Sequence, residues 1–132
     1  MAKRKYKLCI IDDEVVVCKR LQQFFTKAKY EVETFVDSKS AAERISEVRF
    51  DVVVTDIRMD NIDGMEILSL VQKKGEPTKV IMITGYATIE IAREAQAKGA
   101  FDFISKPFRP QELLKVIEKA TKELENSGTK EE

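Results

Sequence analysis

The sequence contains no histidine and only two cysteines. Histidine is the commonest metal ligand and general base in proteins, so its absence leaves carboxylates, hydroxyls, lysine and arginine as the groups that any catalysis must use. The two cysteines, Cys9 and Cys18, both lie in apolar stretches. We interpret them as reduced core residues rather than as a disulfide or a metal-binding pair, which favours a cytoplasmic protein.

The chain also lacks a surplus of charge and a long apolar run. Its 23 lysines and arginines balance its 23 aspartates and glutamates, so we expect no direct nucleic-acid binding, which requires excess positive charge. No apolar stretch is long enough to span a bilayer. The basic start, residues 1–7, precedes only the short run Leu8 to Ile11, which is too short for a signal peptide and ends at two aspartates.

What the sequence does contain is a regular alternation of short apolar runs with longer segments of helical period. Nearly continuous, β-branched runs are typical of strands buried on both faces of a parallel sheet. Three such runs are clear and two are weaker: Leu8 to Ile11, Val52 to Val54 and Val80 to Ile83, then Tyr30 to Val36 and Phe101 to Ile104. Strands that alternate with helices predict βαβ units in one α/β domain, with helices on both faces of the sheet.

The helical segments carry their own signals. Two apolar faces recur at helical spacing: Val17, Leu21, Phe24 and Ala28, and then Leu113, Ile117, Ala120 and Leu124. We expect Ser38 to cap a helix over Lys39 to Val48, Gly75 and Pro77 to end the next one, and Gly99 to end a helix over Ala87 to Lys98. The apolar period stops after Leu124, so we predict a domain over residues 1–124 and a frayed tail or linker over residues 125–132.

Polar residues stand where the predicted strands end. Asp12 and Asp13 follow the first strand, Asp56 ends the third, Thr84 the fourth, and Lys106 comes directly after the fifth. Singly, each has an ordinary explanation as a helix cap, a solvated strand end, a turn residue or a surface ion-pair partner. In an open α/β sheet, however, ligands bind at the carboxyl ends of the strands. We therefore expect three carboxylates, a hydroxyl and an ammonium to meet at one edge.

Such a group of residues favours phosphoryl chemistry. Three adjacent carboxylates repel one another unless a cation offsets them, and oxygen ligands without histidine or thiolate suit Mg²⁺. A carboxylate is already ionised and can attack phosphorus to form an acyl phosphate. A metal ion and a lysine can stabilise the charge on the phosphoryl oxygens, and a hydroxyl can donate to one of them.

With these residues in view, the chain resembles the receiver domains of response regulators, the CheY-like family, from about Lys7 to about Leu124. The motifs are Asp12-Asp13, Asp56 followed by Met59 and Gly64, Thr84-Gly85, and Lys106-Pro107. The stretches 84–88 and 99–108 look most like NtrC-type receivers. The resemblance implies a doubly wound, flavodoxin-like (βα)5 fold with a parallel five-stranded sheet of order 2-1-3-4-5.

The resemblance also implies a role for each matching residue. Asp56 would accept a phosphoryl group from a phosphohistidine on a sensor histidine kinase or a phosphotransfer protein. Asp13, Asp56 and the backbone carbonyl of Arg58 would bind Mg²⁺ or Mn²⁺ directly, and Asp12 would act through water. Lys106 would pair with Asp56 and then with the phosphoryl group, and the Lys106-Pro107 peptide bond would be cis.

Further residues would respond to phosphorylation. The resemblance makes Thr84 and Phe103 the switch pair, and we expect the face over residues 87–122 to bind a partner or a second copy of the chain. Arg58 and Tyr86, together with Gly85, should flank the phosphoryl group and restrict attacking water. Two positions depart from the family pattern: Asp60 replaces the usual proline, and Phe103 replaces tyrosine. Phe103 can also be interpreted as a core aromatic.

Other functions are open on sequence grounds. An aspartyl-phosphate phosphatase or phosphotransferase uses the same residue types, but such enzymes usually carry a second aspartate two positions after the nucleophile, where this chain has Arg58. A nucleotide-binding module would need a glycine-rich phosphate loop after the first strand, and none is present. We expect a receiver that catalyses only its own phosphorylation and dephosphorylation, and that regulates transcription through an output domain outside this sequence.

Overall fold

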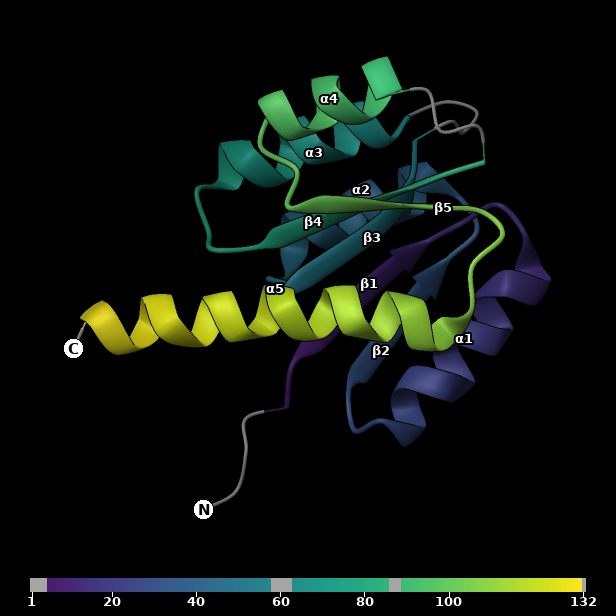
Figure 1. The fold of residues 1–132 in the computed structure, drawn as a ribbon, viewed down its shortest axis with the longest axis horizontal. Helices are drawn as coiled ribbons and strands as arrows, with labels where there is room; N and C mark the ends of the chain where they lie inside the picture. The colour runs from purple at the N-terminus through teal and green to yellow at the C-terminus, as the bar shows by residue number, and fades with distance from the viewer. Residues whose placement is uncertain (1–4, 58–62, 86–88, 132) are drawn as a thin grey trace.

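The computed structural model describes residues 5–57, 63–85 and 89–131 of the chain (Figure 1). Strands and helices alternate along these residues from the first strand to the last helix. The strands are β1 (Lys7–Ile11), β2 (Glu31–Phe35), β3 (Val52–Asp56), β4 (Lys79–Thr84) and β5 (Asp102–Ser105). The helices are α1 (Val15–Lys27), α2 (Ser38–Glu47), α3 (Gly64–Lys74), α4 (Ile89–Ala97) and α5 (Pro110–Glu131).

All five strands pair in parallel in the order β2-β1-β3-β4-β5, which confirms the predicted fold. The central strands are the continuous apolar runs of the sequence, and every residue of β3 is buried. Such strands can only lie inside a sheet that is covered on both faces. The register sets Leu8 of β1 opposite Val52, and Val52 in turn opposite Lys79 of β4.

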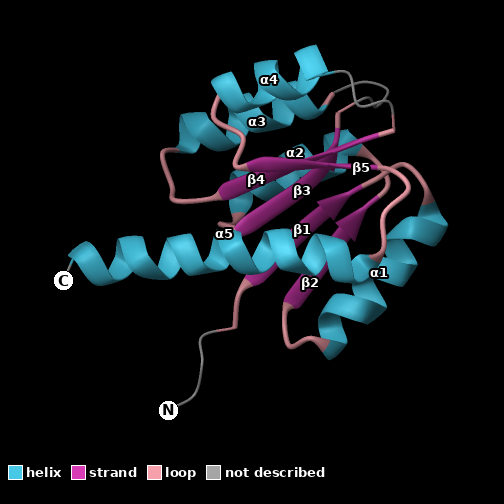
Figure 2. Cartoon of the chain, viewed as in Figure 1, coloured by secondary structure: helices cyan, strands magenta, loops and turns pink. Residues whose placement is uncertain are grey.

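Two apolar clusters fill the space between the sheet and its helices, one on each face (Figure 2). On one face, α2, α3 and α4 contribute residues such as Ile45, Ile67 and Ala95. On the other, α1 and α5 contribute residues such as Leu21 and Ile117. Because side chains alternate along a strand, consecutive residues of β3 serve the two clusters in turn. The sheet is therefore held rigidly between two cores.

Several helix ends confirm the sequence signals and one corrects them. Gly75 adopts the left-handed conformation (φ 71°) at the end of α3, as expected of a C-terminal glycine. At the start of α2 the cap is Asp37 rather than Ser38. The Asp37 carboxylate accepts hydrogen bonds from the backbone N–H groups of Lys39 and Ser40, so Ser38 becomes the first residue of the helix.

Helix α5 continues to Glu131, through residues for which the sequence predicts a frayed tail or a linker. Up to residue 126, where the description of side-chain burial ends, the last core residue of α5 is Leu124, which is the last position of the predicted apolar face. Figure 1 shows the C-terminal turns of α5 projecting beyond the sheet. An established helix extends cheaply, since each added residue gains one hydrogen bond without a new nucleation cost.

Two smaller expectations concern cysteines and membranes. Cys9 and Cys18 are both buried and unpaired, as predicted. Burial raises the pKa of both thiols, that of Cys18 to about 11, so they remain protonated at neutral pH. Among the described residues, no helix is both long enough and apolar enough to cross a membrane.

Candidate functional site

The polar residues that end the strands meet at one edge of the sheet, as the sequence predicts. Asp12 follows β1 directly, Asp56 is the last residue of β3, and Thr84 is the last residue of β4. Lys106 comes immediately after β5. Parallel strands in register place these positions side by side, since Asp56 lies opposite Ile83, the neighbour of Thr84. The fold alone thus converts distant sequence positions into one group.

Three carboxylates form the centre of this group. One oxygen from each of Asp12, Asp13 and Asp56 lies within 4.8 Å of the others. Asp12 is fully buried and Asp56 is 6% exposed, whereas Asp13 is exposed. The arrangement therefore presents two desolvated carboxylates and one that reaches into solvent.

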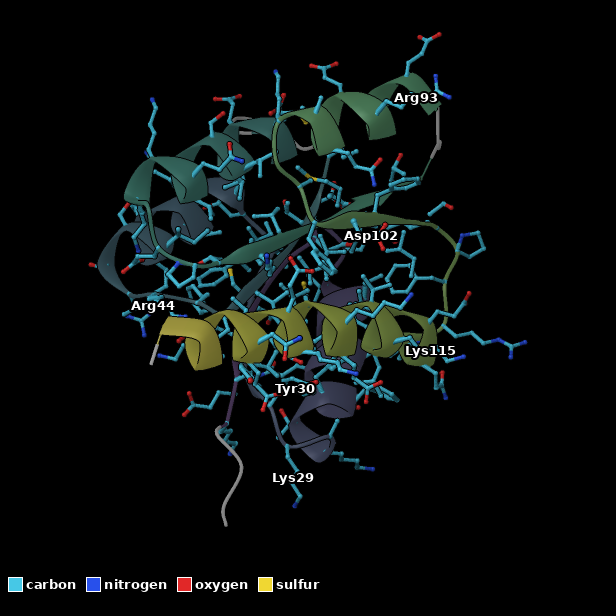
Figure 3. All side chains as sticks on the ribbon, turned by 60° about the vertical axis from the view of Figure 1, so that its left-hand side comes forward. Lys29, Tyr30, Arg44, Arg93, Asp102 and Lys115 are labelled. Atoms are coloured by element: carbon cyan, nitrogen blue, oxygen red, sulfur yellow. The ribbon has the colours of Figure 1, made fainter. Side chains whose placement is uncertain are left out.

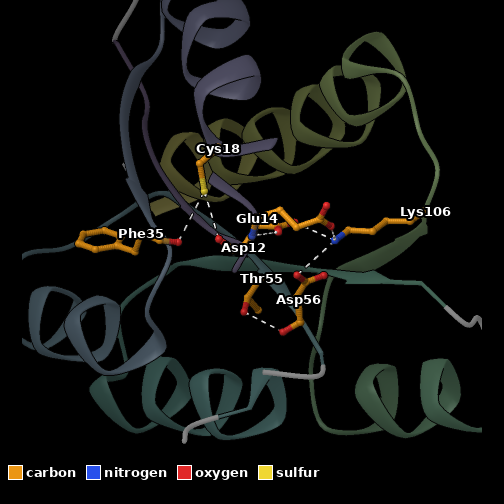
Figure 4. A network of polar contacts seen from close by, with 7 residues as sticks. All are labelled: Asp12, Glu14, Cys18, Phe35, Thr55, Asp56 and Lys106. Carbon is orange, nitrogen blue, oxygen red and sulfur yellow. Dashed lines mark hydrogen bonds and ion pairs between the residues drawn. The ribbon is translucent and has the colours of Figure 1, made fainter. Parts of the chain in front are cut away.

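Lys106 supplies the positive charge among the described residues at this edge. Its Nζ lies 3.0 Å from Asp12 Oδ2, 3.1 Å from Glu14 Oε1 and 3.4 Å from Asp56 Oδ2 (Figure 4). The contact with Asp12 is an ion pair without good hydrogen-bond geometry, so the buried Asp12 Oδ2 has no well-formed hydrogen bond. The peptide bond between Lys106 and Pro107 is cis.

The electrostatics of the group follow from burial and crowding. Burial, together with the charge of Asp12, raises the pKa of Asp56 to about 7, and Lys106 opposes this rise without cancelling it. Burial by itself would lower the pKa of Lys106. Its interactions with Asp12, Glu14 and Asp56 outweigh that effect and raise this pKa above the ordinary value. The cluster thus carries more negative charge than one ammonium can neutralise.

Three hydrogen bonds hold Asp12, two at its backbone and one at its side chain. Its N–H donates to the carbonyl of Phe35 at 3.0 Å. Its carbonyl accepts from the Cys18 thiol at 3.3 Å, and its Oδ1 accepts from the N–H of Glu14 at 2.8 Å. Figure 4 shows these contacts converging on Asp12 from α1 and the end of β2. Asp12 therefore stays in place despite its unfavourable surroundings.

Asp56 is positioned by the start of α3. A Cβ atom on Gly64 would lie 2.4 Å from the Asp56 carbonyl oxygen, so only glycine allows this approach. The Gly64 N–H donates to the carbonyl of Ile57 at 2.8 Å, and the Thr55 hydroxyl donates to the carbonyl of Asp56 at 3.0 Å. These contacts fix the backbone from which the Asp56 side chain projects.

A cavity of about 280 Å³ opens above the cluster, lined by Asp13, Glu14, Asp56, Ile83, Thr84, Gly85 and Lys106. A larger hollow of about 700 Å³ lies elsewhere, bordered by Tyr6, Tyr30 and α5. Its lining mixes lysines with glutamates, and the carboxylate cluster is not part of it. We therefore place the functional site at the smaller cavity, where Asp56 and Lys106, both of perturbed pKa, lie beside the carboxylate cluster.

The predicted site residues have different outcomes. Asp12, Asp13, Asp56, Thr84 and Lys106 come together as expected. Phe103 is partly buried and packs against the apolar cluster between the sheet and helices α2, α3 and α4. It therefore also fits the interpretation as a core aromatic. Arg58, Asp60 and Tyr86 lie outside the described residues.

Sequence reasoning missed Glu14. It follows the two aspartates at the start of α1, and nothing in the spacing sets it apart from an ordinary exposed residue of a first helical turn. In the structure its carboxylate contacts Lys106 and lines the cavity. The available signal was its adjacency to the Asp12-Asp13 pair, which places a fourth carboxylate at the same edge.

This arrangement can support phosphoryl transfer to a carboxylate. The Asp56 carboxylate, a group that can act as a nucleophile, borders a small cavity, and Lys106 lies where it can interact with a transferred group. The Thr84 side chain lies at the edge of the same cavity. The donor set, one carboxylate oxygen each from Asp12, Asp13 and Asp56, is of the kind that divalent cations prefer.

Comparisons with known proteins identify the family of the chain. Residues 8–118 match the family model of the response regulator receiver domain. The chain is 38% identical over 120 residues to the transcriptional regulatory protein FlgR of Helicobacter pylori; the match covers 90% of this chain and 30% of FlgR. It is 33% identical over 117 residues to the chemotaxis protein CheY of Listeria monocytogenes, covering 88% of this chain and 98% of CheY.

A solved structure agrees with these sequence matches. The chemotaxis protein CheY4 of Vibrio cholerae superposes with a TM-score of 0.82 at 29% identity, covering 89% of this chain and 99% of CheY4. The relatives thus include proteins of which this chain spans less than a third and others that it spans almost completely. The matched family model, the relatives and the fold establish that the chain belongs to the response regulator receiver domain family.

Proposed function

We propose that Asp56 accepts a phosphoryl group and that this transfer is the signalling event of the domain. The observation that carries the proposal is the position of Asp56. Its nearly buried carboxylate lies 3.4 Å from Lys106 and within ligand distance of two further carboxylates, at the mouth of a cavity. Membership of the receiver family supports the same role.

In this proposal the Asp56 carboxylate attacks the phosphorus of a phosphohistidine on a sensor histidine kinase or a phosphotransfer protein. A P–O bond forms, the P–N bond breaks, and the departing imidazole nitrogen takes the electron pair and is then protonated. Lys106 stabilises the charge that gathers on the phosphoryl oxygens, and the Thr84 hydroxyl donates to one of them. Asp56 needs no general base, because its attacking form is the carboxylate.

The carboxylate cluster fits a divalent cation, Mg²⁺ or Mn²⁺. Asp13 and Asp56 would hold it directly and Asp12 through water, with the carbonyl of Arg58 as a ligand beyond the described residues. The buried Asp12 and Asp56 favour a cation here, because the one Lys106 ammonium that they share with Glu14 does not neutralise all of these carboxylates. When bound, the ion would offset the negative charge shared by the carboxylates and the phosphoryl oxygens.

The readout would be a change at the face formed by α4, β5 and α5. Figure 3 labels one residue on each of these elements, Arg93, Asp102 and Lys115, on one side of the molecule. Thr84 precedes α4 and Lys106 follows β5, so a new partner for either side chain acts directly on that face. Phe103, on β5 between them, is the second switch residue. We propose that this face binds a partner or a second copy of the chain.

The wider context is also part of the proposal. FlgR is named a transcriptional regulatory protein, and the chain spans 30% of it; CheY is named a chemotaxis protein, and the chain spans nearly all of it. We propose that this receiver acts in the cytoplasm and controls transcription through an output domain rather than by binding nucleic acid itself. Its balanced charge supports the last point.

We further propose that the domain turns over no external substrate. The enzyme alternative, an aspartyl-phosphate phosphatase or phosphotransferase, would release product continuously from a phosphate ester such as p-nitrophenyl phosphate. Arg58 stands where such enzymes place their second aspartate. Arg58 and Tyr86, together with the cavity residue Gly85, should instead limit the access of water, so R58A or Y86A should shorten the lifetime of the phosphorylated protein.

The direct test uses acetyl phosphate as the donor. Incubation with MgCl2 should add one phosphoryl group, seen as a mass increase of the intact protein, and EDTA should prevent it. Borohydride reduction followed by peptide mapping should convert Asp56, and no other aspartate, to homoserine. Labelling on a different residue, or none under conditions where the protein is folded, would reject the proposal.

A further inference from the structure

We infer that Glu14 is a positioning residue that restrains Lys106 and repels the phosphoryl donor, so that it slows phosphorylation of Asp56. The inference rests on the proposed function of Asp56. Its starting point is the set of contacts around Lys106 (Figure 4). The Lys106 ammonium has three N–H donors and three carboxylates within ion-pair distance, and Asp56, the nucleophile, is the most distant of the three.

Glu14 and Asp56 compete for the ammonium of Lys106, and Glu14 lies closer to it. Nζ of Lys106 lies 3.1 Å from Glu14 Oε1 and 3.4 Å from Asp56 Oδ2. A lysine that stabilises a phosphoryl group on Asp56 must give up or weaken one of its present contacts. Asp12 is completely buried, so losing its ion pair would leave a desolvated charge. The Glu14 side chain is 61% exposed, and water can replace its partner. Apart from the contact with Asp56 itself, which the phosphoryl group would replace, the contact with Glu14 is therefore the easier one to give up.

Glu14 also adds charge at the entrance. It lines the cavity together with Asp13, Asp56 and Lys106, so an incoming phosphoryl donor meets a third carboxylate there. Its backbone N–H donates to Asp12 Oδ1 at 2.8 Å, which keeps the residue at the rim whatever its side chain does. Substitution by glutamine thus removes the charge and weakens the contact with Lys106 without removing the backbone support of Asp12.

Two effects of opposite sign follow from Glu14→Gln. The rate of phosphorylation at saturating Mg²⁺ should rise, because Lys106 is freed and the donor is repelled less. The affinity for Mg²⁺ should fall, because the cluster loses one negative charge and Lys106 competes more strongly with the cation for Asp56. Each change should be about two- to fivefold, since an exposed ion pair contributes little. Local structural damage would instead lower both the rate and the affinity.

The experiment measures the two quantities separately. Mg²⁺ affinity is obtained by calorimetric titration of the unphosphorylated protein, and the rate by mass spectrometry with acetyl phosphate at saturating Mg²⁺. Glu43→Gln is the matched control, because it removes the same charge from an exposed position of α2 and should change neither quantity. Raising the KCl concentration should reduce the difference in rate between wild type and E14Q, as expected for a screened, exposed charge.

The outcomes separate this inference from the proposed function. A faster rate with weaker Mg²⁺ binding in E14Q supports the role of Glu14. Unchanged values, or a joint decrease, would overturn it even if wild-type Asp56 is labelled normally. If wild type is not labelled at Asp56 at all, the proposed function fails first, and the inference fails with it.

Discussion

Strand β3 is flanked by two buried aspartates, and their surroundings differ sharply. Asp51 stands immediately before the strand and is 4% exposed, and Asp56 ends it and is 6% exposed. Asp51 Oδ2 accepts the Lys7 N–H at 2.8 Å, and its Oδ1 lies 3.2 Å from Arg49. Within the described part of the chain, the ion pair of Asp56 is the longer contact with Lys106, at 3.4 Å, and other carboxylates crowd it.

The difference shows that burial alone does not mark a functional carboxylate. Asp51 also joins three strands through its backbone, since its N–H donates to Lys7 and its carbonyl accepts from Lys79. The charge of Asp51 is therefore paired at the point where its backbone links neighbouring strands. The charge of Asp56 is left poorly matched at the opposite end of the strand, where a cavity opens. A carboxylate whose ionised form is unfavourable is available for a ligand or for chemistry.

The largest expected effect separates the two aspartates by reactivity. Asp56→Asn should abolish labelling by acetyl phosphate in the presence of Mg²⁺, because the amide is not a nucleophile for phosphorus. Asp51→Asn should be labelled as wild type is, since it lies at the other end of the strand. Intact-protein mass spectrometry measures both. Loss of labelling in D51N while the protein remains folded would mean that the two ends of β3 are coupled.

The same two variants should move stability in opposite directions. D51N replaces a paired carboxylate and should lower the free energy of unfolding by roughly 1–2 kcal/mol, the usual loss for a hydrogen bond to a charged group. D56N removes a desolvated charge and its repulsion by Asp12, so at pH 8 without divalent ions it should raise that free energy by about 2 kcal/mol. Urea denaturation followed by circular dichroism tests this, and equal signs for both would refute the comparison.

The strands that position this site were easier to predict from the sequence than the exact helix ends and side-chain contacts. Strand ends at Asp56 and Lys106 were predictable, because β-branched runs mark buried parallel strands and their carboxyl ends share one edge. The order of the strands came from the family resemblance, since alternation alone does not specify it. The helix cap at Asp37 in place of Ser38 was missed, because neighbouring residues have nearly equal capping ability.

The role of Glu14 was missed for a different reason. Its contact with Lys106 joins residues 92 positions apart in the sequence, and only the side-chain directions at the start of α1 bring them together. The extension of α5 past Leu124 is a similar case. The apolar period ends where the core ends, but helix formation continues on backbone hydrogen bonds that leave no periodic signal.

A smaller effect concerns pH. The pKa of Asp56 is raised from 3.8 to about 7, so between these values the folded protein retains a proton that the unfolded chain has lost. This contribution to stability is complete below the unfolded pKa and disappears as pH rises through the folded pKa. Without divalent ions, the free energy of unfolding of wild type should therefore fall by roughly 2–3 kcal/mol from pH 5 to pH 8, because each pH unit over which only the folded protein holds this proton lowers it by about 1.4 kcal/mol.

D56N lacks this titration, so its stability should change less than that of wild type over the same range. D51N should keep the wild-type slope, because Asp56 is intact in that variant. Urea denaturation at pH 5, 6, 7 and 8 gives the slopes. Parallel curves for wild type and D56N would show that Asp56 ionises without cost, and the contrast between the two ends of β3 would then disappear.

The smallest effect expected is the response of stability to Mg²⁺. A cation that binds only the folded protein stabilises it by about 1.4 kcal/mol at ten times its Kd. Wild type and D51N should show this increase in the free energy of unfolding at pH 8, because the carboxyl-end cluster is intact in both. D56N loses one ligand and one charge and should respond clearly less. If D51N lost its response and D56N kept it, the cation site would lie at the amino end of β3, with Asp51 rather than Asp56 as its ligand.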